Sequence, residues 1–318
     1  MRYTVKNLHY LCSKHSNMEE NNPIVRINSV DDYNRLFGFE TLHPLVSVVD
    51  FSTNAKILEK SRFLYGVYAL FLKHGEQCVM HYGRRKYDYT DGSIVSFAPG
   101  QAVDVEMRKD VPASGAIGLL FHPDLIYGTT LGRHINEYHF FDYDSAESLH
   151  LSQREQQLYK DTLNSIQFEL EQAIDKHSQT IIVDRIKLLL DYCQRFYDRQ
   201  FITRHKENSD IIASFERNIN EYFQSGAAKM NGMPQVGYFA EKAFLSAGYF
   251  GDLIKKETGQ TAKQLIQQKI ITLSKQMLLD NRYTINQVAD ELGFQYPQHF
   301  SRFFKQQVGM SPKEYKLG

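Results

Sequence analysis

The fold of the C-terminal part of the chain is decided by the stretch Tyr283–Lys316, which reads YTINQVADELGFQYPQHFSRFFKQQVGMSPKEYK. Thr284 and Gln287 have the spacing of a capping box, in which two side chains satisfy the free amide groups at the start of a helix. Gly293 suits the left-handed backbone of a tight exit turn, and Pro297 suits the first position of a new helix. The stretch therefore predicts a helix, a short turn and a second helix.

The second of these helices has two different faces. Phe300, Phe303 and Phe304 fall at i, i+3 and i+4, which predicts one buried side. The opposite side is polar: glutamine can pair with adenine, arginine can pair with guanine, and lysine suits a phosphate. A solvated polar face on an ordinary packing helix is the alternative explanation. The residues predicted to bind DNA from this helix and its start are Tyr296, Gln298, His299, Ser301, Arg302 and Lys305.

A partial copy of this pattern lies fifty residues upstream, in the stretch Phe239–Ile266, with one residue slipped in its first helix. A helix predicted over Ala262–Leu279 joins the two copies, and its 18 residues would span ~27 Å at ~1.5 Å per residue. Successive major grooves on one face of DNA lie ~34 Å apart, so this helix has a suitable length to hold two copies in adjacent grooves. The matched residues are Phe244 with Phe294, Phe250 with Phe300, Lys255 with Lys305, and Gly259 with Gly309.

Residues 210–316 resemble the DNA-binding domain of the AraC/XylS transcriptional regulators, and the motif INQVADELGFQYPQHFSRFFKQQVGMSPKEYK carries the resemblance. The resemblance implies two helix-turn-helix units and double-stranded DNA as a partner. It also implies RNA polymerase as a partner if the protein is an activator. In the second unit, the base-reading positions implied by the resemblance are Gln298, His299 and Arg302.

In the first unit, the resemblance places the base-reading positions on Gly248, Gly251 and Asp252. Two glycines offer no side chain, and a carboxylate repels phosphate and could accept only from cytosine. Two explanations therefore stay open. The first unit either reads bases with Ser246, Tyr249 and Asp252, or mostly anchors the DNA backbone through Lys255 and Lys256. We favour anchoring.

Residues 44–121 have the pattern of short strands separated by turns. Their richness in β-branched and aromatic residues predicts a small sandwich or barrel. The predicted strands are LVSVVDF, GVYALFLK, CVMHY, YDYT, SIVSF, AVDVEM and AIGLLF. By the family resemblance, residues 1–150 are expected to be a cupin-like domain that binds a small-molecule effector. Tyrosine combines an apolar ring with a polar tip, so the candidate effector contacts are Tyr65, Tyr68, Tyr82 and Tyr87.

Residues 151–206 are predicted to form two amphipathic helices, the first of which starts at a Ser152–Glu155 capping box. These helices either cover the strand domain or pair with a second subunit, and the resemblance implies a homodimer. The rest of the chain, 207–318, is the predicted DNA-binding domain. The apolar positions are Leu158, Thr162, Ile166, Leu170 and Ile174 in the first helix, and Ile182, Ile186, Leu189, Cys193 and Phe196 in the second.

The sequence favours no enzyme. A metal-binding cupin needs closely spaced histidines with a carboxylate, and His74, His81, His134 and His139 lack that spacing. No Gly-rich phosphate loop and no Gly-x-Ser-x-Gly elbow occurs. We therefore expect no catalytic residue, no metal and no cofactor. The alternatives are a DNA-binding regulator without a small effector, or a metal-dependent cupin enzyme fused to a DNA-binding domain.

The 318 residues suffice for two or three domains, and the formal net charge is zero. Cys12, Cys78 and Cys193 match no disulfide or metal spacing, and the N-terminal stretch lacks the apolar core of a signal peptide. No run approaches the ~20 apolar residues that span a bilayer. We expect a cytoplasmic protein without a membrane partner. Its predicted class is α+β: a cupin-like barrel or sandwich with a helical segment, then an all-α domain with two helix-turn-helix units.

Overall fold

The computed structural model describes residues 24–52, 60–73, 78–82, 85–86, 92–107, 115–143, 147–203, 205–280 and 282–317. The chain divides into two compact units. Unit 1 contains Met1–Phe141 and Ser148–Cys193, and unit 2 contains Asp142–Glu147 and Gln194–Gly318. Helix α6, Ser178–Thr203, therefore begins in unit 1 and ends in unit 2. The short segment Asp142–Glu147 belongs to unit 2, although the chain on both sides of it belongs to unit 1.

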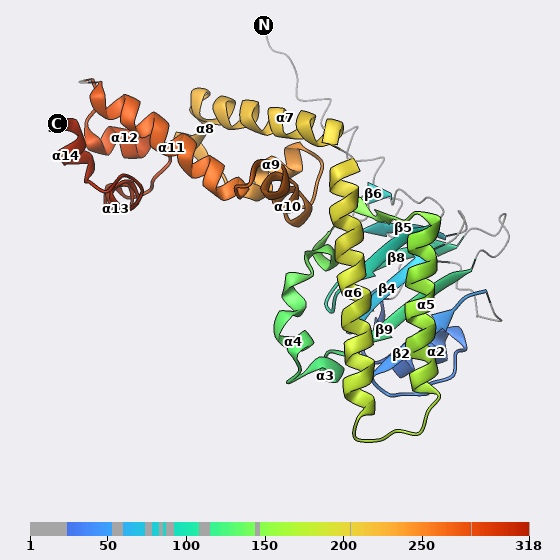
Figure 1. Cartoon of the computed structure of the whole chain (residues 1–318). Helices are drawn as coiled ribbons and strands as arrows, with labels where there is room; N and C mark the ends of the chain where they lie inside the picture. Colours follow the sequence, from blue (N-terminus) through green and yellow to red (C-terminus); the bar gives the residue numbers. More distant parts are fainter. Residues whose placement is uncertain are drawn as a thin grey trace, which may run out of the picture. The chain divides into compact units, whose positions relative to one another are not determined.

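Unit 1 is built on two five-stranded sheets (Figure 1). One sheet has the order β1-β3-β8-β5-β6 and the other the order β10-β7-β4-β9-β2. β1 pairs in parallel with β3, whereas β4 pairs antiparallel with both β7 and β9. The strands are β1 (Ile24–Ile27), β2 (Val46–Asp50), β3 (Lys60–Tyr65), β4 (Tyr68–Lys73), β5 (Cys78–Tyr82), β6 (Arg85–Lys86), β7 (Ser93–Phe97), β8 (Ala102–Met107), β9 (Ala116–Phe121) and β10 (Leu149–His150).

Most of the predicted strands are confirmed. CVMHY, SIVSF, AVDVEM and AIGLLF coincide with β5, β7, β8 and β9, and β2 and β4 lie within LVSVVDF and GVYALFLK. The predicted strand YDYT lies outside the described residues. Strands β1, β3, β6 and β10 were not predicted. Two of these, β6 and β10, are only two residues long, too short for a periodic pattern to appear in the sequence.

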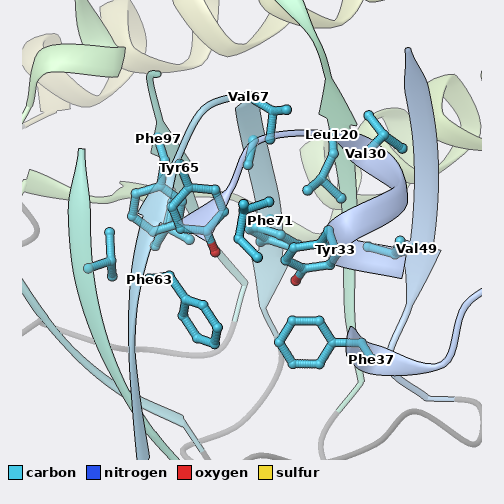
Figure 2. Packing of buried hydrophobic residues seen from close by; sticks show 14 residues of the cluster. Val30, Tyr33, Phe37, Val49, Phe63, Tyr65, Val67, Phe71, Phe97 and Leu120 are labelled. Carbon is cyan, nitrogen blue, oxygen red and sulfur yellow. The ribbon is translucent and has the colours of Figure 1, made fainter. Parts of the chain in front are cut away.

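The core of unit 1 is an aromatic cluster that joins both sheets to helix α2 (Val30–Phe37), as Figure 2 shows. Tyr65 from one sheet stacks on Phe97 from the other, with ring centroids 5.1 Å apart. Tyr33 of α2 stacks on Phe71 of the second sheet at 5.9 Å. Burying one such side chain contributes roughly 1.5–3 kcal/mol. The two sheets and α2 are therefore held together by side chains of the chain itself.

Helix α5 (Gln153–Leu170) and the first part of α6 run beside the sheets (Figure 1). The Ser152–Glu155 capping box is confirmed, and α5 packs against β2 and β9. The Arg185 guanidinium of α6 donates to the Ser165 carbonyl of α5. The predicted apolar positions of α6 are buried inside the chain: Ile182, Ile186, Leu189, Cys193 and Phe196. These positions are therefore buried without a second subunit.

One predicted position of the first helix is wrong. The apolar series was expected to continue to Ile174, but α5 ends at Leu170 and Ile174 is 69% exposed. The physical reason lies in the next residues. The Asp175 carboxylate accepts hydrogen bonds from the backbone amides of His177 and Ser178, at 2.7 and 3.0 Å, and so starts helix α6 instead.

Shorter helical elements between β9 and β10 are α3 (Pro123–Ile126), α4 (Thr130–His134), η1 (Ile135–Glu137) and η2 (His139–Asp142).

Unit 2 is helical beyond the end of α6. Helix α11 runs between two pairs of short helices, α9 with α10 and α12 with α13 (Figure 1). Within the described residues, no helix is long and apolar enough to cross a membrane. The helices are α7 (His205–Gln224), α8 (Ala227–Asn231), α9 (Val236–Lys242), α10 (Ala247–Thr258), α11 (Ala262–Leu279), α12 (Ile285–Glu291), α13 (Pro297–Val308) and α14 (Pro312–Leu317).

Helix α11 has the predicted bounds, and Thr261 caps it. Its buried residues recur at steps of four, at Ala262, Ile266, Ile270, Ser274 and Leu278. Ser274 is tolerated there because its hydroxyl donates to the Ile270 carbonyl at 2.7 Å.

Candidate nucleic-acid interface

The second helix pair, α12 and α13, is fixed by local signals at its start and its turn. The Thr284 hydroxyl accepts a hydrogen bond from the Gln287 amide, and the Gln287 side chain accepts one from the Thr284 amide at 2.9 Å. Gly293 follows with φ 83°, where a Cβ atom would lie 2.6 Å from the Ala228 carbonyl oxygen. Pro297 is the first residue of α13. The predicted capping box, glycine turn and proline start are all confirmed.

The rotation of α13 about its axis is set by its buried phenylalanines. Phe300 and Phe304 are fully buried, and the Phe300 ring lies 5.3 Å from that of Phe294. The opposite side of the helix is exposed to solvent. Gln298, His299, Arg302 and Lys305 are all exposed on it.

The outward face of α13 carries side chains of the types that can bind base edges in a DNA groove. The helix contains Arg302, Lys305 and His299 but no aspartate or glutamate. Arginine and glutamine can each form two hydrogen bonds to one base edge in the major groove. Tyr296 is 46% exposed at the start of the helix, and its ring meets that of His299 at 5.3 Å. The Ser301 hydroxyl instead donates to the Pro297 carbonyl at 3.0 Å, so it is engaged by the helix itself.

The first helix pair, α9 and α10, has a similar inner face but a different outer one. Phe250 and Ile254 of α10 are fully buried, like Phe300 and Phe304 of α13. Tyr249 is also buried, whereas His299 at the matching position of α13 is exposed. The remaining predicted positions, Ser246, Gly248, Gly251 and Asp252, are half-buried.

The two lysines of α10 are in different surroundings. Lys255 is exposed. The Lys256 ammonium forms an ion pair with Asp198 and lies 4.8 Å from the centre of the Phe201 ring. Its burial lowers the pKa of Lys256 below the ordinary value of a lysine. Both predicted anchoring residues are exposed, but the Lys256 ammonium is held by these contacts.

The match of Phe244 with Phe294 is wrong. Phe244 has φ 60° and stands where Gly293 stands, directly after the first helix of its pair. The Leu245 amide donates to the Ala240 carbonyl at 2.9 Å, as the Phe294 amide donates to the Ala289 carbonyl. Leu245 is therefore the counterpart of Phe294. The second turn contains one residue more than the first, which shifts the two copies by one position.

The candidate effector contacts of unit 1 are dispersed. Tyr65 belongs to the aromatic core, and Tyr68 stacks on Phe121 with ring centroids 4.9 Å apart. Tyr82 ends strand β5, and Tyr87 lies outside the described residues. A pocket of about 160 Å³ lies elsewhere in this unit and has none of the four tyrosines in its lining. Its lining residues are Phe39, Glu40, Leu42, Val46, Ser47, Val48, Gln167 and Leu170. No group of three metal-binding side chains occurs among the described residues.

Comparison with known proteins places the C-terminal part of the chain. Residues 239–317 match the family model described as a helix-turn-helix domain. The chain is 33% identical over 82 residues to a probable transcriptional regulator LumQ of Photobacterium leiognathi, which covers 26% of this chain and 33% of that protein. It is 24% identical over 117 residues to the transcriptional activator RhaR of Escherichia coli, which covers 36% of this chain and 42% of RhaR. The chain thus spans less than half of these curated relatives.

Two of the solved structures that are similar to this chain differ in how much of it they cover. The C-terminal domain of the two-component response regulator YesN from Fusobacterium nucleatum is 24% identical, with a TM-score of 0.29, and covers 32% of this chain and 96% of that one. ToxT from Vibrio cholerae is 12% identical, with a TM-score of 0.26. The match covers 86% of this chain and 98% of the ToxT chain. Residues 239–317 of this chain therefore form a helix-turn-helix domain, which is similar in sequence to parts of curated transcriptional regulators.

Proposed function

We propose that this protein is a sequence-specific DNA-binding transcription regulator of the AraC/XylS type, whose two helix-turn-helix units are α9–α10 and α12–α13. The observation that carries the proposal is the outer face of α13. Gln298, His299 and Arg302 are exposed there, while Phe300 and Phe304 are fully buried behind them. A helix needs only its inner face to dock on its own domain, so a basic outer face free of acidic residues favours a nucleic acid.

In the proposed complex, α13 lies in the major groove with its N-terminal end toward the base edges. Arg302 would donate to guanine O6 and N7, and Gln298 would pair with adenine. Lys305 would contact a phosphate. Helix α11 has 18 residues, about 27 Å at ~1.5 Å per residue, which suits a second unit placed in the adjacent groove.

The experiment that tests this function is selection of bound duplexes from random DNA, followed by affinity measurements on the recovered sequence. Arg302→Ala is expected to weaken that complex by about 1–3 kcal/mol and to relax the preference at one base pair. Arg302→Lys is the matched control, since it keeps the charge but cannot bind guanine through a planar fork. It should keep the salt dependence and lose the base preference. Equal losses for Arg302→Ala on selected and random duplexes would refute base reading by α13.

The proposed role of the first unit is to anchor the DNA backbone. The exposure of Lys255 supports this role, because an exposed lysine is accessible to a phosphate. Lys255→Ala should weaken selected and random duplexes alike. The slope of log affinity against log salt should also become shallower by about one. A loss confined to the selected sequence would instead assign Lys255 to base reading.

Dimerisation is a further part of the proposal, with apolar side chains that α5 and α6 leave exposed as the contact. Ile181 and Leu188 of α6 are 37% and 46% exposed and lie seven residues apart, on one stripe of the helix. Phe168 of α5 is 60% exposed. Leu188→Asp should convert a dimer into a monomer in sedimentation experiments, because a charge in an apolar helix contact is not solvated. Gln194→Asp, a half-buried position of the same helix, is the matched control.

Control by a small effector in unit 1 is the last part of the proposal. An effector present at a hundred times its dissociation constant should raise the free energy of unfolding by ~2.7 kcal/mol, which a thermal shift against metabolites would detect. The pocket of about 160 Å³ is smaller than the ~300 Å³ at which ligand sites of ordinary size begin. Two of the candidate effector contacts, Tyr65 and Tyr68, stack on Phe97 and Phe121, which favours a second candidate, a regulator controlled by a partner protein or by its abundance. Absence of any shift across the panel would select this second candidate.

A further inference from the structure

The N-terminus of helix α10 is capped by a residue from a distant part of the chain. Ser246 is the N-cap residue, and its hydroxyl accepts a hydrogen bond from the Tyr249 amide at 3.1 Å. The carboxylate of Glu147 accepts from both the Ser246 amide and the Ser246 hydroxyl, at 2.6 Å each. Glu147 is only 2% exposed and lies 99 residues before Ser246 in the sequence.

This cap differs from those of the neighbouring helices. In α11 and α12 the third helical residue, Gln264 or Gln287, returns its side chain to the amide of the capping threonine. In α10 the third residue is Tyr249, which cannot do so. Glu147 makes that hydrogen bond instead. The start of α10 is therefore completed by Glu147, which belongs to unit 2 although the chain that follows it belongs to unit 1.

Tyr143 lies over the outer face of α10. The Tyr143 hydroxyl donates to the Asp252 carboxylate at 2.7 Å, and the Tyr143 ring meets that of Tyr249 at 5.2 Å. At Gly248, a Cβ atom would be 3.6 Å from the Tyr143 ring. Tyr143 is itself 8% exposed. Its neighbours therefore include Gly248, Tyr249 and Asp252, the three positions that match Gln298, His299 and Arg302 of α13.

The C-terminal end of α6 completes this cover. The Tyr197 hydroxyl donates to the Glu147 carbonyl at 3.4 Å, and the Tyr197 ring meets that of Tyr143 at 5.1 Å. The Phe201 ring lies 4.8 Å from that of Tyr249. Tyr197 and Phe201 are both buried. We call Tyr143, Glu147, Tyr197 and Phe201 together the α10 cover.

We propose that the α10 cover is an autoinhibitory element, which competes with DNA for the first helix-turn-helix unit and so lowers the affinity of that unit for DNA. This inference rests on the proposed function. A recognition helix in a major groove must present its outer face and N-terminal end to the DNA, and Tyr143 and Glu147 occupy both. The N-terminus of a helix favours an anion, so the Glu147 carboxylate takes a position that suits a DNA phosphate.

The connections of the chain explain how the cover would respond to a signal. Segment Asp142–Glu147 continues into unit 1 at both ends, at Phe141 and at Ser148. A ligand or partner that changes unit 1 can therefore bias the segment toward or away from α10. The coupling is reciprocal, because DNA that engages α10 must displace the same segment.

The test compares full-length variants on a duplex recovered by selection with the Glu147→Gln variant, and on the same duplex shortened by the ~10 base pairs that α10 would contact. Glu147→Gln removes the charge but keeps the size of the side chain, and should raise affinity for the intact duplex about tenfold. Tyr143→Phe removes one hydrogen bond and should raise that affinity a few-fold. Neither variant should gain affinity for the shortened duplex, since only α10 is released. In footprinting, protection of the ~10 base pairs on the α10 side should increase.

Tyr138→Phe is the matched control, because it removes a tyrosine–aspartate hydrogen bond of the same length, 2.7 Å to Asp191, inside unit 1. Tyr138→Phe should leave the affinities for both duplexes unchanged. Unfolding of α10 cannot imitate the expected result, since a damaged α10 would lower affinity. Unchanged or lower affinity of Glu147→Gln and Tyr143→Phe for the intact duplex would overturn the inference. If Arg302→Ala also had no effect on selected DNA, the proposed function itself would fail.

Discussion

Helices α10 and α13 occupy corresponding places in two similar helix pairs, yet they present opposite surfaces. Their inner faces agree, with Phe250 and Phe300 both fully buried. Their outer faces do not: Arg302 is exposed on α13, whereas Asp252 of α10 accepts a hydrogen bond from Tyr143. The comparison teaches that the inner face of such a helix specifies the fold, while the outer face is free to acquire a separate role.

The turns of the two pairs differ in the same instructive way. Gly293 adopts φ 83° in the second turn, where backbone atoms of α8 and the following residues leave no room for a side chain. Phe244 adopts φ 60° in the first turn, with its side chain 74% exposed. A left-handed backbone costs a non-glycine residue about 1–2 kcal/mol. The left-handed backbone of the second turn therefore suits its glycine, whereas Phe244 strains the backbone of the first turn.

The largest expected effect is that of Gly293→Ala. A Cβ atom there would meet the Ala228 carbonyl oxygen at 2.6 Å and backbone atoms of Gly232 and Met233 below 3 Å. Together with the left-handed φ, this should lower the free energy of unfolding by about 3 kcal/mol in urea denaturation. Gly309→Ala is the control, because φ is 87° there but no atom lies within 4 Å. It should cost only about 1–2 kcal/mol. Equal losses of stability for Gly293→Ala and Gly309→Ala would show that the backbone around Gly293 moves to make room for a side chain.

A smaller effect is expected from removing the N-cap side chains of the two units. Ser246→Ala should cost about 2 kcal/mol, since it removes the cap of α10 and one hydrogen-bond partner of the buried Glu147 carboxylate. Thr284→Ala should cost about 1 kcal/mol, because the Gln287 side chain that it leaves behind is exposed and finds water. Denaturation of both variants measures the difference. A larger loss for Thr284→Ala would contradict a stabilising role of Glu147.

The smallest expected effect is a gain in stability. Phe244→Gly removes the left-handed strain but adds backbone freedom to the unfolded chain, for a net gain of about 0.5–1 kcal/mol. Little packing is lost, because the Phe244 side chain is 74% exposed. Phe244→Asn should show a smaller gain, since asparagine tolerates this conformation better than phenylalanine but less well than glycine. A loss of stability in both variants would mean that the Phe244 ring makes a stabilising contact.

Local signals in the sequence were sufficient for several elements. The Thr284–Gln287 box, Pro297 and the phenylalanine spacing predicted α12 and α13, and α11 was predicted with its observed bounds. Helix α2 was not predicted, although Ser29 and Asp32 form a capping box and Gly38 ends the helix with φ 84°. The signal for α2 was therefore present in the sequence, in a segment outside the strand-rich zone.

The sequence by itself determined the helix starts, the turns and the basic outer face of α13, because each depends on residues three or four positions apart. Only the tertiary structure decided that Glu147 completes the cap of Ser246 and that Tyr143 lies over α10. It also decided that Asp142–Glu147 leaves unit 1 to join unit 2. The physical reason is separation along the chain. A contact between residues 99 positions apart arises from the packing of whole elements, and that packing leaves no periodic pattern in the sequence around either residue.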